Sequence, residues 1–267
     1  MNNTLIGAEC KFITLVDKFR LIIVSFFCSL LLISQGMAEQ SNVARLISLE
    51  TKIYQDPYQV YKTLENIKTS IRVDREDELL WFYLRKAQAE YLLYFFEDFE
   101  QTVAEGKGLL KSNTFPEITA RFLVYSSYID GNKGNYKRAI TDLEKAISLS
   151  ESDGSLEVLV MAKRQLAFIY MSIGQYESSL NDLEQIMEEA KTLDNDFLKG
   201  KIYEVYGALY NYMENYDQSI AVYKKAIEIY RQLQYRSLLV SVYYDLAKSY
   251  QENKQYDDAL KYYQLYI

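Results

Sequence analysis

The side chains that most often carry out acid–base or nucleophilic chemistry are scarce in this sequence. It contains no histidine, so the commonest general base and the commonest neutral metal ligand are both missing. Its two cysteines, Cys10 and Cys28, lie in an N-terminal segment that we expect to be removed from the mature chain. What remains for chemistry is an abundance of carboxylates, as in residues 182–189 (DLEQIMEE), and 26 tyrosines.

These remaining groups do not form a catalytic pattern. Paired carboxylates can perform general acid–base catalysis, but those of residues 182–189 recur at helical spacing, which is typical of a solvated helix face. Residues 105–110 (EGKGLL) are too short for a glycine-rich phosphate loop. We therefore expect this stretch to be non-catalytic, without a cofactor or a metal site. Whether a longer protein would add a catalytic domain stays open.

Composition favours a helical chain and argues against a nucleic-acid partner. The 267 residues include only two prolines and ten glycines, too few for a protein made of many strands and tight turns. The formal net charge is −7 with both signs mixed, whereas a nucleic-acid-binding protein would show a basic face. The same balance disfavours binding to anionic lipid through a polybasic patch.

The N-terminal segment, residues 1–38, has the pattern of a secretory signal peptide. Basic residues occur up to Arg20, residues 21–34 are apolar or small, and Gly36 and Ala38 provide a small-x-small cleavage site. A spanning helix needs roughly 20 apolar residues, so the run is short for a membrane span, although an uncleaved anchor remains an alternative. We expect residues 39–267 to be periplasmic or otherwise extracytoplasmic.

The rest of the chain repeats one amphipathic sequence. Tyr136, Tyr176, Tyr216 and Tyr256 open four similar segments at one constant spacing. Two weaker copies precede them if Phe99 and Tyr58 are given the same position, although Phe99 then lies three residues closer to Tyr136 than this spacing requires. A fixed period of about 40 residues is the signature of a solenoid.

The periodicity inside each copy is that of a helical hairpin. The third copy carries an apolar stripe at steps of four and three: Tyr216, Ile220, Tyr223, Ile227 and Tyr230. A second stripe precedes it, and the polar residues 211–215 (NYMEN) separate the two. A single hairpin cannot cover its apolar faces, so neighbouring hairpins must stack.

The order of small and aromatic residues in these copies resembles the tetratricopeptide repeat. The family pattern places a small residue and a tyrosine in the first helix, a glycine in the turn, and aromatic and small residues in the second. Matching residues in one copy are Ala167, Tyr170, Gly174, Tyr176, Ser179 and Leu183. The next two copies have Gly207, Tyr210, Tyr216, Ser219, Tyr223, Ala247, Tyr250, Tyr256 and Ala259, and an earlier one keeps Gly134, Tyr136 and Ala139. The period of this chain is longer than that of the family, which is roughly 34 residues.

This resemblance implies an all-α solenoid, a right-handed superhelix of about five to six hairpins. We divide the chain into a signal peptide or anchor (1–38), divergent helical repeats (39–115) and clear repeats (116–267), the last incomplete. Eight tyrosines fall at repeat-defining positions (136, 170, 176, 210, 216, 223, 250 and 256), so we interpret them as core residues and not as a ligand cage. The chain stops within a second helix, where Tyr262, Tyr263, Tyr266 and Ile267 would leave apolar surface open. We therefore expect it to be truncated or to continue.

In such arrays the first helix of each hairpin lines the concave side, where a protein or peptide partner would bind. The predicted groove residues are Arg121, Tyr128, Arg164, Phe168, Met171, Lys201, Glu204, Asn211, Tyr212, Tyr244, Lys248 and Gln251. A signal sequence followed by such repeats is similar to the exported sensor region of bacterial membrane signalling proteins of the diguanylate cyclase or histidine kinase type. The alternative is a free-standing periplasmic adaptor or assembly factor. A membrane tether through either end is compatible with the first interpretation.

Overall fold

The computed structural model describes residues 42–110 and 115–266. The predicted signal peptide, residues 1–38, lies outside this range. The chain divides into two compact units, residues 1–48 and 49–267. In the first unit the described residues, 42–48, are helical. Across the described ranges, we find no helix with both the length and the apolar character needed to cross a membrane.

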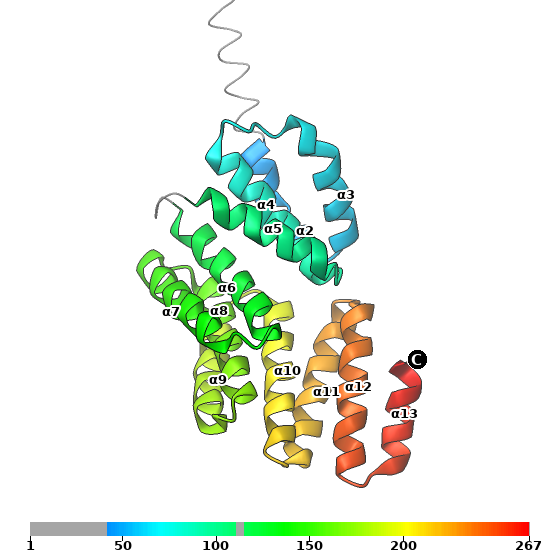
Figure 1. Ribbon diagram of the computed structural model, residues 1–267. Helices are drawn as coiled ribbons and strands as arrows, with labels where there is room; N and C mark the ends of the chain where they lie inside the picture. Colours follow the sequence, from blue (N-terminus) through cyan, green and yellow to red (C-terminus); the bar gives the residue numbers. More distant parts are fainter. Residues whose placement is uncertain (1–41, 111–114, 267) are drawn as a thin grey trace, which may run out of the picture. The chain divides into compact units, whose positions relative to one another are not determined.

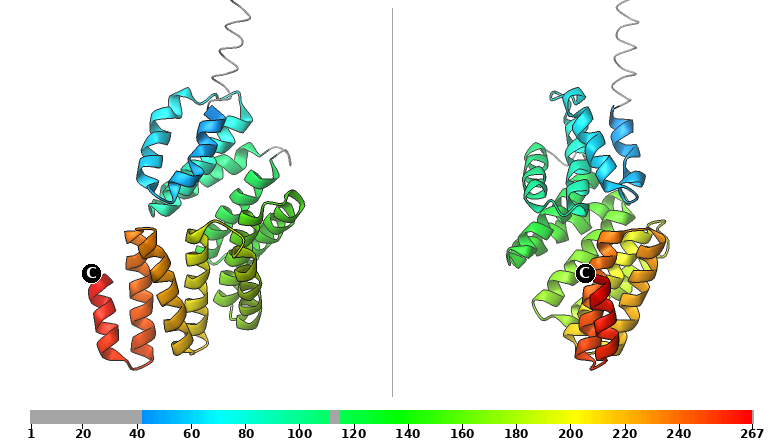
Figure 2. Two further views of the ribbon diagram at one scale, coloured as in Figure 1. Left: turned by 180° about the vertical axis from the view of Figure 1, so that it is seen from behind. Right: turned by 90° about the vertical axis from the view of Figure 1, so that its right-hand side faces the viewer.

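The described part of the second unit consists of helices and the segments that connect them. The helices are α2 (Glu50–Ile53), α3 (Pro57–Ile67), η1 (Lys68–Ser70), α4 (Glu76–Leu92), α5 (Phe96–Leu109), α6 (Pro116–Asn132), α7 (Tyr136–Asp153), α8 (Leu156–Ser172), α9 (Tyr176–Ala190), α10 (Asp196–Tyr212), α11 (Tyr216–Gln232), α12 (Arg236–Glu252) and α13 (Tyr256–Tyr266). From α4 onward they pack as consecutive hairpins, and α10 to α13 lie side by side in Figure 1 and in the left view of Figure 2. The predicted all-α hairpin solenoid is confirmed.

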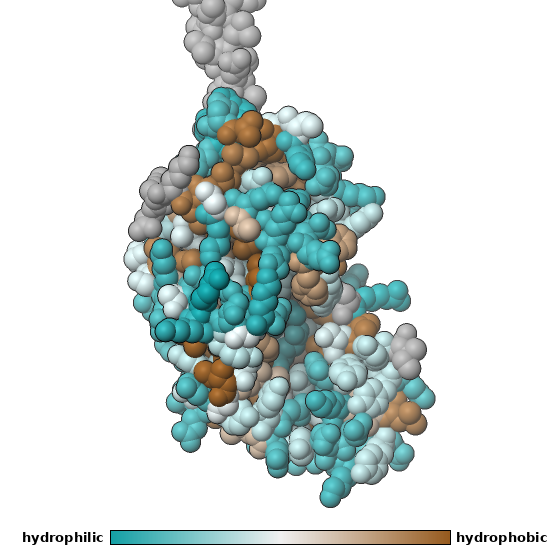
Figure 3. Space-filling view, in the orientation of Figure 1, coloured by the Kyte–Doolittle hydropathy of each residue, from teal (hydrophilic) through white to brown (hydrophobic). Residues whose placement is uncertain are grey.

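The period of the sequence sets where the second helices begin. Helices α7, α9, α11 and α13 start at the four predicted tyrosines. Three residues later each helix buries a small side chain, such as Ala139 or Ser219, both 0% exposed. Small side chains at these positions let the two helices of a hairpin approach closely. The face drawn in Figure 3 is mostly hydrophilic, with apolar patches separated by polar side chains.

The earlier copy also follows this period, which corrects our alignment of Phe99. Helix α5 begins at Phe96, one full period before Tyr136. Phe99 is therefore the third residue after the helix start, where later copies have Ala139 or Ser179. It is 2% exposed and packs its ring 5.6 Å from those of Tyr91 and Tyr125. An aromatic at a position that is otherwise small made this copy look three residues shorter.

Each hairpin turn places one residue in the left-handed backbone region. The five residues are Tyr94 (φ 60°), Gly134 (75°), Gly174 (81°), Glu214 (59°) and Lys254 (61°), which again recur at the period of the sequence. After each of them the next N–H donates to the carbonyl five residues earlier, as from Gln255 to Tyr250 at 2.9 Å. These are the bonds of a Schellman motif, which favours glycine at its left-handed position.

Lys254→Gly is expected to raise the free energy of unfolding by about 0.5–1 kcal/mol. A residue with a side chain costs roughly 1–2 kcal/mol in the left-handed region, and glycine removes that cost. Part of this gain is offset because glycine has more conformational entropy to lose when the chain folds. Gly174→Ala is the control and should lower the free energy of unfolding. A Cβ at this position meets no atom within 4 Å, so the decrease would come from the left-handed backbone alone. Urea unfolding measures both. A decrease for Lys254→Gly would contradict the explanation.

Candidate functional site

A cavity of about 640 Å³ opens among the first helices of the hairpins. Side chains of α4, α6, α8, α10 and α12 line it, with a few from α5 and α11. Four successive first helices contribute the residue at the same repeat position to the lining. These residues, each one period apart, are Tyr128, Phe168, Ala208 and Lys248. The period of the sequence therefore builds one continuous surface from five helices.

Nine of the twelve predicted groove residues line this cavity. They are Tyr128, Arg164, Phe168, Met171, Lys201, Glu204, Asn211, Tyr212 and Lys248. The structure brings these nine residues together, and their role in binding a partner stays a prediction.

The structure does not place the other three predicted residues in the lining. Tyr244 packs against α13, its ring centroid 5.2 Å from that of Tyr266. Gln251 accepts a hydrogen bond from the Tyr263 hydroxyl at 3.1 Å, also in α13. Both residues thus contact the second helix of their own hairpin. Arg121 is only 3% exposed and takes part in an ion-pair network.

Glu50 of α2 is the centre of that network. Its carboxylate lies 2.8 Å from the guanidinium of Arg121 and 2.8 Å from that of Arg85, whose side chain is fully buried. Glu117 and Glu157 lie 3.0 and 3.7 Å from Arg121. Although burial acts to raise the pKa of Glu50, the charges of Arg121 and Arg85 hold that pKa below its ordinary value. The network links α2 with α4, α6 and α8.

Our prediction missed several lining residues. Tyr91 lies two periods before Met171, so with the correct alignment of α5 the repeat would have identified it. Asp245 lies one helical turn before Lys248 on α12, on the same face. Tyr216 and Tyr223, which we interpreted as core, also line the cavity, and Tyr256, interpreted in the same way, is 65% exposed.

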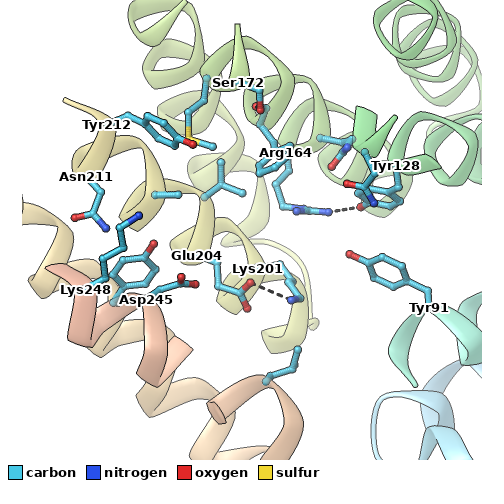
Figure 4. Close-up of a pocket in the computed structure, with 18 of the residues that line it drawn as sticks. Tyr91, Tyr128, Arg164, Ser172, Lys201, Glu204, Asn211, Tyr212, Asp245 and Lys248 are labelled. Atoms are coloured by element: carbon cyan, nitrogen blue, oxygen red, sulfur yellow. Dashed lines mark hydrogen bonds and ion pairs between the residues drawn. The ribbon is translucent and has the colours of Figure 1, made fainter. Parts of the chain in front are cut away.

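In the part of the lining formed by α4, α6 and α8, a buried cation meets two tyrosines (Figure 4). Arg164 of α8 is 7% exposed, and its Nη2 donates a hydrogen bond to the hydroxyl of Tyr128. The rings of Tyr128 and Tyr91 stack with centroids 5.0 Å apart, and Tyr91 points toward this pair. Burial raises the pKa of both phenols, so they remain protonated donors at neutral pH.

Carboxylates occupy the part of the cavity nearer α12. Glu204 is compensated, since Lys201 Nζ lies 3.0 Å from its Oε2 and the Tyr230 hydroxyl donates to its Oε1. Asp245 points toward the same region from α12 (Figure 4). Burial and the nearby charge of Glu204 raise the pKa of Asp245 to about 6. The cavity therefore carries charges of both signs.

Asp245→Asn is expected to stabilise the protein at pH 8 by about 1–2 kcal/mol, with the gain vanishing near pH 4. Because the pKa of Asp245 is raised in the folded state, the protein loses stability as pH rises through about 6 and Asp245 becomes charged. Asparagine resembles the protonated acid at every pH, so the variant does not undergo this loss. The full shift would correspond to about 3 kcal/mol, reduced here because the side chain is only half-buried. Urea unfolding at several pH values measures the difference, and the exposed Asp194→Asn is the control. A gain that does not change with pH would contradict the explanation.

The chemistry of the lining suits binding. Aromatic faces, the amides of Gln165 and Asn211, and a few charges surround a concave volume within the range of ligand pockets. Within residues 42–110 and 115–266, no group of three or more metal-binding side chains comes together.

Comparisons with known proteins agree with the repeat pattern. Residues 157–232 and 198–267 match a sequence model of the tetratricopeptide repeat, and residues 126–153 match another model of the same repeat. None of the curated protein sequences matches the chain.

Solved structures with a similar fold share little sequence with this chain. NprR in complex with its cognate peptide NprX aligns with a TM-score of 0.67 and 16% identity, covering 85% of this chain and 65% of that one. Aspartyl phosphate phosphatase F from Bacillus subtilis aligns at 0.61 and 15%, covering 84% and 59%. BtubC from P. vanneervenii aligns at 0.53 and 16%, covering 84% and 87%. This chain thus spans less than two thirds of NprR and of phosphatase F, and at these identities the likeness shows the fold alone.

Proposed function

Because this chain is a tetratricopeptide-repeat protein over residues 126–153 and 157–267, we propose that it is a non-catalytic scaffold that binds an extended peptide or protein segment in its concave cavity. The observation that carries the proposal is the lining itself, to which five successive first helices contribute aromatic, amide and charged side chains. A groove of this kind suits extended peptides. NprR, which has the same fold, was solved with a bound peptide, and this supports the proposal as an analogy.

Filling the cavity tests the proposal directly. Ala208 lies on α10 in the lining and is half-buried, so a tryptophan there would project into the cavity. Ala208→Trp is expected to weaken binding of N-acetylated, C-amidated heptapeptide pools at least tenfold, measured by fluorescence anisotropy. Ala221→Trp is the matched control, because Ala221 is exposed on α11 and does not line the cavity. Equal affinity for the two variants would contradict binding in the cavity.

We also propose that the chain is exported and serves as the sensory input of a larger signalling protein. The signal-peptide pattern of residues 1–38 supports export. The test is a reporter enzyme that becomes active only outside the cytosol, fused after residue 60. Activity that depends on residues 1–38 is expected, and activity without them would refute the signal. A native mass equal to that of residues 39–267 would refute the sensory role and favour a free-standing adaptor.

A further inference from the structure

Arg164 differs from the other buried arginines of the described chain. Arg85 and Arg121 each lie 2.8 Å from the carboxylate of Glu50. Arg164 is also at least nine-tenths buried, yet within the described ranges it forms no ion pair, and its Nε has no hydrogen-bond partner. Its Nη2 donates to a neutral group, the hydroxyl of Tyr128.

A buried cation without a counter-charge is costly. Removing an ionised group from water carries a large penalty that hydrogen bonds to neutral groups only partly offset. The carboxylate of Glu204 favours the charged form of Arg164, but its oxygens are bound by Lys201 and the Tyr230 hydroxyl, and it forms no ion pair with the guanidinium. Arg164 lies in the cavity lining, where a bound anionic group could reach it.

We propose that Arg164 is the counter-charge for an acidic side chain, Glu or Asp, of the bound peptide; this rests on the function proposed above. A guanidinium presents a planar fork of donors that matches a carboxylate, and the free Nε belongs to that fork. The Tyr128 hydroxyl accepts from Arg164 and so keeps its own proton to donate to the same carboxylate. The site would therefore offer donors from both residues to one anion.

The cavity indicates a side chain and not a chain terminus. Its lining continues past Arg164 in two directions, to Tyr94 and Phe96 around the start of α5 and to Asn211 and Leu238 on α10 and α12. A peptide that fills this length passes over Arg164 and does not end there. The group that reaches the guanidinium is then a side chain in the middle of the bound segment.

The test uses three pools of N-acetylated, C-amidated heptapeptides with a fixed central Glu, Gln or Lys. The unaltered protein is expected to bind the Glu pool at least tenfold more tightly than the Gln pool, and the Lys pool most weakly. Arg164→Gln should abolish the preference for Glu over Gln. Arg138→Gln is the matched control, since Arg138 is 74% exposed and outside the lining, and it should keep the preference.

Tyr128→Phe is the second variant, because it keeps the cation and removes one donor. It should reduce the Glu preference two- to fivefold, so the proposal can be judged even if Arg164→Gln folds poorly by circular dichroism. Equal binding of all pools by the unaltered protein, still blocked by Ala208→Trp, would overturn the role of Arg164 while the proposed function stands. Binding of no pool would overturn both. Tighter binding of uncapped peptides with a free C-terminus than of the Glu pool would overturn the side-chain assignment.

Discussion

Glu50→Ala is expected to lower the free energy of unfolding by about 3–5 kcal/mol, because it removes the carboxylate that two buried arginines share. Glu50 lies 2.8 Å from both Arg85 and Arg121, which are 0% and 3% exposed. Arg121 also pairs with Glu117 and Glu157, and Arg85 also donates to the side-chain oxygen of Gln88 at 2.8 Å.

Urea unfolding followed by far-UV circular dichroism measures this loss, and Glu117→Ala is the matched control. Glu117 also pairs with Arg121, at 3.0 Å, but its side chain is 38% exposed. An exposed pair contributes about 0–1 kcal/mol, so the control should change stability little. If both variants lost the same small amount, the ion-pair network would not hold the N-terminal hairpins together.

Gly207→Ala is expected to lower the free energy of unfolding by about 2–3 kcal/mol, because the added methyl group overpacks a buried site. A Cβ at Gly207 would lie 2.5 Å from Cε1 and Cζ of the Tyr223 ring. That ring is only 2% exposed, so most of its surface is already packed against other atoms. It also contributes to the cavity lining. The substitution should also disturb binding, since Tyr223 must shift.

The control for this prediction is the same substitution at a glycine with open space. Gly108 is exposed near the end of α5, and a Cβ there meets no atom within 4 Å. Gly108→Ala should raise stability by about 0.5–1 kcal/mol, because alanine has less conformational freedom to lose in a helix. Both changes are read from the urea midpoint. A stabilising Gly207→Ala would show that the helices α10 and α11 do not approach as closely as described.

The hairpins were predictable because their packing repeats at a fixed period. Small residues at one position and tyrosines at the helix starts are needed in every copy, so the pattern recurs in the sequence. The concave lining followed from the same arithmetic, since Tyr128, Phe168 and Lys248 share one position of the first helix. A packing requirement that every copy must meet can therefore be recognised in the sequence without knowing which helices lie beside each copy.

The errors arose where neighbours outside the repeat decide the environment. Arg121 and Lys201 occupy the same position two copies apart. Arg121, however, forms an ion pair with Glu50 of α2 and does not line the cavity. Arg164 and Tyr244 are likewise equivalent, but Tyr244 packs on α13. No periodicity in the sequence predicts which terminal helix covers a given side chain.

The central claim is that the concave lining binds a peptide, and hydrogen exchange with the tightest-binding heptapeptide pool tests it most directly. Bound peptide should slow exchange in α8, α10 and α12, whose side chains line the cavity, relative to α7 and α9, which contribute none. The Ala208→Trp variant should show no such protection. Protection confined to α7 and α9, or protection that persists in Ala208→Trp, would contradict the claim.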